Sequence, residues 1–181
     1  CDSLQNARDL SGAAAGAGVN LGVLIELETQ MNRCGVQDIE QGVALAQGIH
    51  SLPGLTFRGI MSHQMIPPME DREDRVTEGR RMIQVVIDLK DAIVAAGIPV
   101  EIVSTGETWS YDVAGEIPGV TEVQGGSYLV METKYSYMSD FHYSGKVLTT
   151  IISTPRPGIA VGDAGARAVG ALRMPEVDSR P

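Results

Sequence analysis

The fold is decided by a short apolar run, Leu21-Gly-Val-Leu-Ile-Glu-Leu27, which turn residues bound on either side. A run of this length and composition is typical of a buried strand. Helical spacing of apolar residues precedes it over Leu4 to Ala15, where Ser3 can cap the helix. A second helix, which Asp38 can cap, follows it and stops at Pro53. The order helix, strand, helix predicts an α/β fold.

The same alternation continues along the chain. A second strand is expected over Leu55-Thr-Phe-Arg-Gly-Ile-Met61, a third helix from about Arg72 to Ala96, a third strand over Pro99-Val-Glu-Ile-Val103 and a fourth near Val120-Thr-Glu-Val123. Repeated αβ units with short turns predict a parallel sheet with helices on its faces. Either a (β/α) barrel or an open doubly wound sheet satisfies this pattern.

The pattern changes after Lys146. The β-branched run Val147-Leu-Thr-Thr-Ile-Ile-Ser153 is followed by a turn at Pro155-Arg-Pro-Gly158 and by a second short run, Ile159-Ala-Val-Gly-Asp163. Two strands joined by such a turn predict a hairpin. We therefore expect a partial (β/α) barrel over residues 1–140 and the beginning of a β-domain over residues 141–181.

Composition excludes several classes of partner. The 181 residues include 14 Lys and Arg against 23 Asp and Glu, a net charge of −9, and an acidic surface repels nucleic-acid phosphates. No apolar run approaches the roughly 18–20 residues of a membrane helix. Cys1 and Cys34 are too few for a disulfide framework, so a reducing, cytoplasmic compartment is expected. The opening Cys-Asp-Ser does not resemble a natural start or a signal peptide, and we interpret the sequence as an internal segment.

Polar and glycine residues lie where the predicted strands end, which is where parallel α/β folds build their sites. His63 follows the second strand, Thr105-Gly106 the third, and Gly125-Gly126-Ser127-Tyr128 the fourth. Glycines beside hydroxyl residues let backbone N–H groups converge on an anion. Either loop alone is more often a simple turn, but the pair on adjacent strands predicts a phosphate site. His63 either lines this pocket or caps its strand.

Other candidate sites are weaker. The glycines between Gly12 and Gly18 precede a strand, whereas a dinucleotide fingerprint follows one. The dispersed His50, His63 and His142 predict no self-contained metal site. Trp109 either lines the pocket or covers the end of the sheet.

Several motifs together resemble a known group of enzymes. They are, in order, Met31-Asn-Arg-Cys-Gly-Val36, Phe57-Arg-Gly-Ile-Met61, Val103-Ser-Thr-Gly106, Thr121-Glu-Val-Gln-Gly-Gly-Ser-Tyr128 with Val130-Met131, and Val147 to Gly165 ending in Asp163-Ala-Gly165. The sequence is similar to the D-threonine aldolase and D-serine dehydratase group of pyridoxal-phosphate enzymes, relatives of the alanine racemase N-terminal domain. The resemblance implies the second half of a (β/α)8 TIM-type barrel followed by the start of a C-terminal β-domain.

The resemblance also implies site residues. The family's cofactor-phosphate loops correspond to Thr105, Gly106, Gly125, Gly126, Ser127 and Tyr128, a family arginine beside the cofactor ring corresponds to Arg33, and a pocket position that is often Tyr corresponds to His63. The chain departs from the pattern at Glu107, where relatives carry small residues, and at Gln64-Met65-Ile66, where they have Glu-Gly-His. A carboxylate beside a phosphate site is unfavourable unless it points away.

The implied activity is a pyridoxal 5′-phosphate-dependent carbon–carbon lyase that converts D-β-hydroxy-α-amino acids to glycine and an aldehyde. A D-serine or 3-hydroxyaspartate dehydratase, an amino-acid racemase and a non-catalytic cofactor- or phosphate-binding protein remain open. The family's Schiff-base lysine lies upstream of Cys1, so no catalytic residue is named in this sequence, and His63 is expected only as a pocket residue. Ligands of a divalent metal (Mn, Mg or Zn) are expected beyond the segment. The resemblance further implies a small amino-acid substrate and a homodimer.

Overall fold

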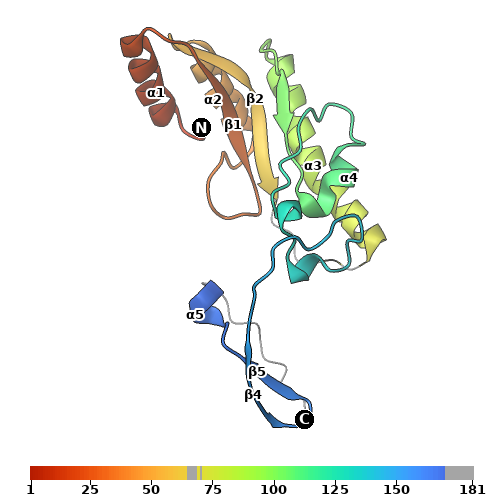
Figure 1. Cartoon of the computed structure of the whole chain (residues 1–181). Coiled ribbons are helices and arrows are strands. Elements are labelled where there is room, and N and C mark those ends of the chain that lie inside the picture. Colours follow the sequence, from red (N-terminus) through yellow and green to blue (C-terminus); the bar gives the residue numbers. More distant parts are fainter. Residues whose placement is uncertain (65–68, 70, 170–181) are drawn as a thin grey trace.

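The computed structural model describes residues 1–64, 69 and 71–169 (Figure 1). Along the chain the helices and strands are α1 (Leu4–Ala17), β1 (Leu21–Thr29), α2 (Ile39–His50), β2 (Leu55–Gln64), α3 (Arg72–Ala95), β3 (Ile102–Ser104), α4 (Tyr111–Ala114), β4 (Ile151–Arg156), β5 (Ile159–Gly162) and α5 (Ala166–Val169). Short 3-10 turns cover Thr108–Ser110, Ser127–Leu129 and Thr133–Tyr135. The predicted alternation of helices and parallel strands is confirmed.

The first sheet contains β1, β2 and β3 in that order, and all its strand pairs are parallel. The pairing aligns Glu28 with His63, so the carboxyl ends of the first two strands lie side by side. The prediction of a fourth strand is wrong in extent: among the described residues it is reduced to one bridge between Ser104 and Glu122. The third strand also begins at Ile102 rather than at Pro99, since proline has no N–H to give to a ladder.

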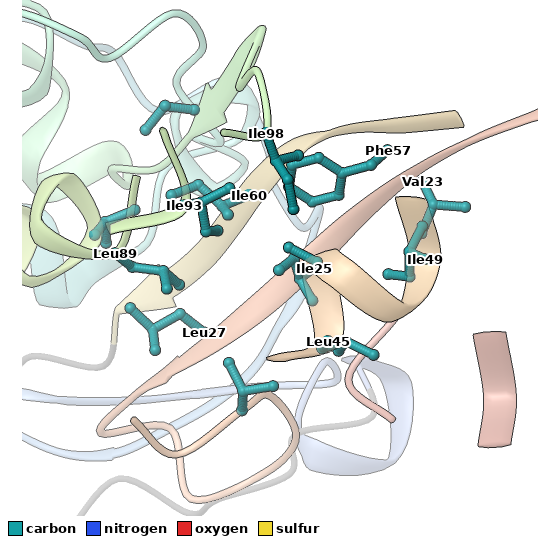
Figure 2. Packing of buried hydrophobic residues seen from close by; sticks show 14 of the residues in the cluster. Val23, Ile25, Leu27, Leu45, Ile49, Phe57, Ile60, Leu89, Ile93 and Ile98 are labelled. Carbon is teal, nitrogen blue, oxygen red and sulfur yellow. The ribbon is translucent and has the colours of Figure 1, made fainter. Parts of the chain in front are cut away.

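Helices cover one face of this sheet. On β1 the buried residues alternate with half-exposed ones, so that Ile25 and Leu27 face the helices while Leu24 and Glu26 lie on the opposite face. Figure 2 shows Ile25 and Leu27 among side chains that include Leu45, from α2. Burying each such side chain contributes roughly 1.5–3 kcal/mol. The expected buried strand is thus buried on its helix face only.

The helix ends follow the predicted signals. The Ser3 side chain accepts a hydrogen bond from the Asn6 N–H at 3.2 Å, and Asp38 Oδ1 accepts from the Gln41 N–H at 2.8 Å. Each bond satisfies a backbone donor that the first turn leaves unpaired. At the other end of α1, Gly18 has a φ of 67°, which suits the left-handed cap that ends a helix.

The predicted hairpin is confirmed, with β4 and β5 paired antiparallel. In Figure 1 it stands apart from the parallel sheet. The turn begins two residues later than expected, because β4 continues through Pro155 to Arg156 and the chain reverses at Pro157-Gly158. The ladder is irregular around Pro155, as expected for a residue without an N–H. Among the described residues no helix is long and apolar enough to cross a membrane.

Candidate functional site

The two predicted loops lie against each other beyond the carboxyl end of the sheet. The Gln124 N–H donates to the Gly106 carbonyl at 3.1 Å, and the Tyr128 N–H donates to Thr108 Oγ1 at 3.1 Å. A Cβ placed on Gly125 would lie 3.5 Å from the Thr108 nitrogen. The structure therefore brings together the segments that the sequence singled out after the third and fourth predicted strands.

The buried side chain of Gln64 supports the first of these loops from inside the fold. Gln64 Nε2 donates to Ser62 Oγ at 2.6 Å and to Thr105 Oγ1 at 2.5 Å, and its Oε1 accepts from the Gly106 N–H at 3.1 Å. All three side chains of this network are buried. The Thr105 hydroxyl and the Gly106 N–H are thus occupied within the protein, so these two residues shape the loop and do not present free donors.

Sequence reasoning missed the role of Gln64 and registered it only as a departure from the family pattern. The alternation of side chains between the two faces of β2 could have indicated this role, since Ser62 and Gln64 fall on one face and His63 on the other. A polar side chain on the helix-covered face must find partners inside the protein. That requirement would have pointed to Gln64.

The second loop carries the free donors. In the part of the chain that the structure describes, the backbone N–H groups of Gly125, Gly126 and Ser127 donate to no protein acceptor. Gly126 is exposed, and a Cβ on it would meet no atom within 4 Å. Successive backbone N–H groups without protein acceptors can converge on an anion. The Ser127 hydroxyl itself donates to Glu132 Oε1 at 2.8 Å, and the Tyr128 ring is about half exposed, 5.6 Å from the ring of Phe141.

Titratable side chains gather beside the loops. Nδ1 of His63 lies 2.5 Å from Oε1 of Glu107. Arg33, in the loop after β1, is about half exposed and pairs with Glu26 at 3.3 Å. Hydrogen bonding to Cys34 and Glu26 raises the pKa of Arg33, so its guanidinium stays charged. The structure thus places Arg33 and His63 in one electrostatic neighbourhood.

Burial governs the proton balance of this neighbourhood. It raises the pKa of Glu107 to about 8, while a backbone hydrogen bond from Gln64 and the charge of Arg33 oppose that rise. Burial also lowers the pKa of His63, and Arg33 adds to this effect. Both shifts favour uncharged groups near neutral pH. The carboxyl group that looked unfavourable beside a phosphate is therefore directed at His63, and its raised pKa favours the neutral form near neutral pH.

Trp109 packs inside the protein. Its side chain is 5% exposed and lies in a small apolar cluster with Met131 and Met138. The buried Arg75 donates to the Trp109 carbonyl at 2.5 Å and to Asp112 Oδ1 at 2.9 Å. Of the two roles expected for Trp109, covering the end of the fold fits this environment. In the described ranges, no group of three or more His, Cys, Asp or Glu side chains could hold a metal ion.

Residues 1–134 match the family described as alanine racemase, N-terminal domain. The chain belongs to the alanine racemase N-terminal domain family. It is 35% identical over 180 residues to a 3-hydroxy-D-aspartate aldolase of Paracoccus denitrificans strain Pd 1222. This match covers 92% of this chain and 46% of that protein. It is also 30% identical over 176 residues to a D-threonine aldolase of an Arthrobacter species, covering 94% and 46%.

Solved structures of the family agree. A crystal structure of D-threonine aldolase from Filomicrobium marinum superposes with a TM-score of 0.85 at 29% identity, covering 92% of this chain and 47% of that one. A D-threo-3-hydroxyaspartate dehydratase from Delftia sp. HT23 superposes with a TM-score of 0.65 at 26% identity, covering 75% and 36%. These neighbours confirm the resemblance and the expected α/β barrel class. The chain spans about half the length of the curated relatives it matches.

Proposed function

We propose that the protein to which this segment belongs is a pyridoxal-phosphate-dependent lyase that splits D-β-hydroxy-α-amino acids into glycine and an aldehyde. The observation that carries the proposal is the pair of adjoining loops, whose unpaired N–H groups at Gly125, Gly126 and Ser127 suit a phosphate. The aldolases among its relatives point to the same chemistry.

The residues present fit such a cofactor. The N–H groups of Gly125, Gly126 and Ser127 would hold the phosphate, while Arg33 and His63 lie at the strand ends where the ring would be placed. Thr105, Gly106 and Tyr128 contribute by fixing the loops, because the Thr105 hydroxyl and the N–H groups of Gly106 and Tyr128 are hydrogen-bonded within the protein. When bound, the cofactor supplies an electron sink for the charge that develops on the substrate.

The decisive experiment uses the full-length protein and the Gly126→Asp variant. An aspartate fits without strain because Gly126 has a φ of −121° and open space around it, but its charge would repel a phosphate. Gly126→Asn is the matched control of nearly the same shape without charge. We expect titration of the cofactor absorbance band to give at least tenfold weaker binding for Gly126→Asp than for Gly126→Asn. Equal affinities in the wild type and both variants would remove the phosphate site.

Product analysis identifies the reaction. With D-threonine or 3-hydroxy-D-aspartate, aldolase activity yields glycine and an aldehyde in equal amounts. A dehydratase is the second candidate, because a D-threo-3-hydroxyaspartate dehydratase is among the structural neighbours. It would yield a keto acid and ammonia without glycine. A protein that binds the cofactor and forms neither product set would be a racemase if the substrate changes its configuration, and a non-catalytic binder if it does not.

Three further proposals rest on the family resemblance, and a fourth rests on the cysteine content. A divalent metal (Mn, Mg or Zn), held by residues outside this segment, would make activity sensitive to a chelator and restorable by metal. Residues 141–181 would begin a C-terminal β-domain, and exposed apolar side chains there such as Leu148 and Ile152 would be covered in the complete protein. The protein would be a homodimer, measurable by sedimentation velocity. The free Cys1 and Cys34 fit a reducing cytoplasm, which cell fractionation tests.

A further inference from the structure

The contact between His63 and Glu107 has a defined place in the fold. His63 lies near the carboxyl end of β2 on the face opposite the helices, and Glu107 lies between Gly106 and Thr108 in the first loop of the candidate site. The Nδ1 to Oε1 distance is 2.5 Å. Oε1 is fully buried, and among the described residues no donor, Nδ1–H of His63 included, reaches it with hydrogen-bond geometry. Atoms this close must share a proton, because two bare acceptors would repel each other.

The shared proton can be bonded either to the carboxyl group of Glu107 or to the imidazole of His63. An ionised Glu107 would accept from Nδ1–H of His63, whereas a protonated Glu107 would donate to Nδ1. The charged groups around the pair are Glu26 on β1 and Arg33 in the loop after it. Arg33 is already paired with Glu26 and is half exposed, so Glu107 has no cation of its own. A buried carboxyl group without a counter-ion favours its neutral form.

The candidate site strengthens this preference. Glu107 lies one residue from Gly106, whose loop adjoins the unpaired N–H groups of the second loop. An anion bound by those groups would repel an ionised Glu107 and would keep its proton in place. The direction of both pKa shifts, upward for Glu107 and downward for His63, agrees with an uncharged pair.

We propose that Glu107 is a positioning residue: its carboxyl group donates a hydrogen bond to Nδ1 of His63, so the imidazole keeps its own proton on Nε2. His63 then offers a neutral N–H donor to an oxygen atom of the bound D-β-hydroxy-α-amino acid, its hydroxyl or its carboxylate. No proton is transferred in forming this arrangement. The inference rests on the proposed function for the identity of the ligand, but the tautomer of His63 is a property of the protein itself.

The tautomer is measurable by nitrogen-15 NMR of histidine side chains in the full-length protein without added substrate, with the His63 signal assigned from a His63→Gln variant. We expect an uncharged imidazole at pH 7 with its proton on Nε2. In Glu107→Gln the amide group can still donate to Nδ1, so this tautomer should persist. In Glu107→Ala it should give way to a mixture. The exposed His50 on α2 is the internal reference, whose signal neither variant should move.

Activity gives the second readout. Glu107→Ala should lower kcat/KM roughly tenfold, the loss expected for one oriented hydrogen bond, and Glu107→Gln should restore it. A proton on Nδ1, a charged imidazole at pH 7, or a tautomer unchanged in Glu107→Ala would overturn the inference. These outcomes are separate from failure of the proposed function, which would appear as absent cofactor binding or the wrong products while the tautomer stayed as stated.

Discussion

Replacing Gln64 with leucine tests whether the candidate loop is held from inside the fold. Leucine has a similar size but no polar atoms, so the change removes the acceptor of the Gly106 N–H and the donor to Ser62 and Thr105. Ser62 and Thr105 would keep the hydrogen bond that joins their hydroxyls at 2.7 Å. The Gly106 N–H would lose its partner in a buried environment.

The expected cost follows from these contacts. A buried N–H left without an acceptor costs about 1–3 kcal/mol, and the lost bonds from the amide to the hydroxyls add about 1 kcal/mol. The apolar gain is small, because Ser62 and Thr105 line the space that the leucine would enter. We therefore expect Gln64→Leu to lower the free energy of unfolding by roughly 2–4 kcal/mol.

Urea denaturation of the full-length protein measures this change, and cofactor titration shows whether the loop still binds. Gln84→Leu is the control, because Gln84 is exposed on α3 and, among the described residues, its side chain bonds only to Asp88. It should stay within about 0.5 kcal/mol of wild type. Hydrogen exchange should also speed up at Gly106 in Gln64→Leu alone. If both variants unfold alike and exchange at Gly106 is unchanged, the supporting role assigned to Gln64 is wrong.

Further variants test the pair, the sheet and the support of α4. The fold raises the pKa of Glu107 from 4.5 to about 8. The contribution of Glu107 to stability should therefore be complete below pH 4.5 and fall by roughly 2–3 kcal/mol, after solvent screening, as the pH rises to 8. Measured against pH, Tm should decline less steeply for Glu107→Gln than for the wild type. Gly59→Ala should destabilise the protein by at least about 3 kcal/mol, because the φ of Gly59 is 152° and a Cβ there would lie 1.9 Å from a carbonyl oxygen of β3. In the same denaturation assay, the control Gly16→Ala in α1 should stabilise the protein by roughly 0.5–1 kcal/mol, because a Cβ there meets no atom within 4 Å. Arg75→Leu removes a buried guanidinium and should cost roughly 2–3 kcal/mol in urea, while Arg72→Leu, exposed beside the same carboxylate, should cost less than about 0.5 kcal/mol.

The sequence was most informative where a local signal and a tertiary requirement coincide. Ser3 and Asp38 mark helix starts that the structure reproduces, because a capping bond is made by residues three apart in the chain. The hairpin was likewise predictable from its proline and glycine turn. The region of the site was predictable too, since parallel strands must bring the loops after them to one edge.

The contacts within the site were not predictable in the same way. The bond between Gly106 and Gln64 joins residues 42 positions apart, and the contact between His63 and Glu107 joins residues from different strand ends. Such pairings depend on how far each strand extends relative to its neighbours, and the spacing of apolar residues in the sequence does not specify this. For the same reason the sequence could not show that the Thr105 hydroxyl would be occupied by the protein.

The separation of supporting and chemical residues at this edge depends on one irregularity in β2. Pairing with β1 runs from Phe57 directly to Gly59, so Arg58 is an extra residue in the ladder. Beyond that point the buried positions change parity, which places Ser62 under the helices and His63 on the opposite face. A regular strand would exchange these two faces and would bury His63 among apolar side chains. The irregularity requires a glycine at position 59, because the backbone there leaves no room for a Cβ against β3. The chemistry proposed for His63 and Glu107 therefore depends on a glycine and an extra residue in the strand that carries His63.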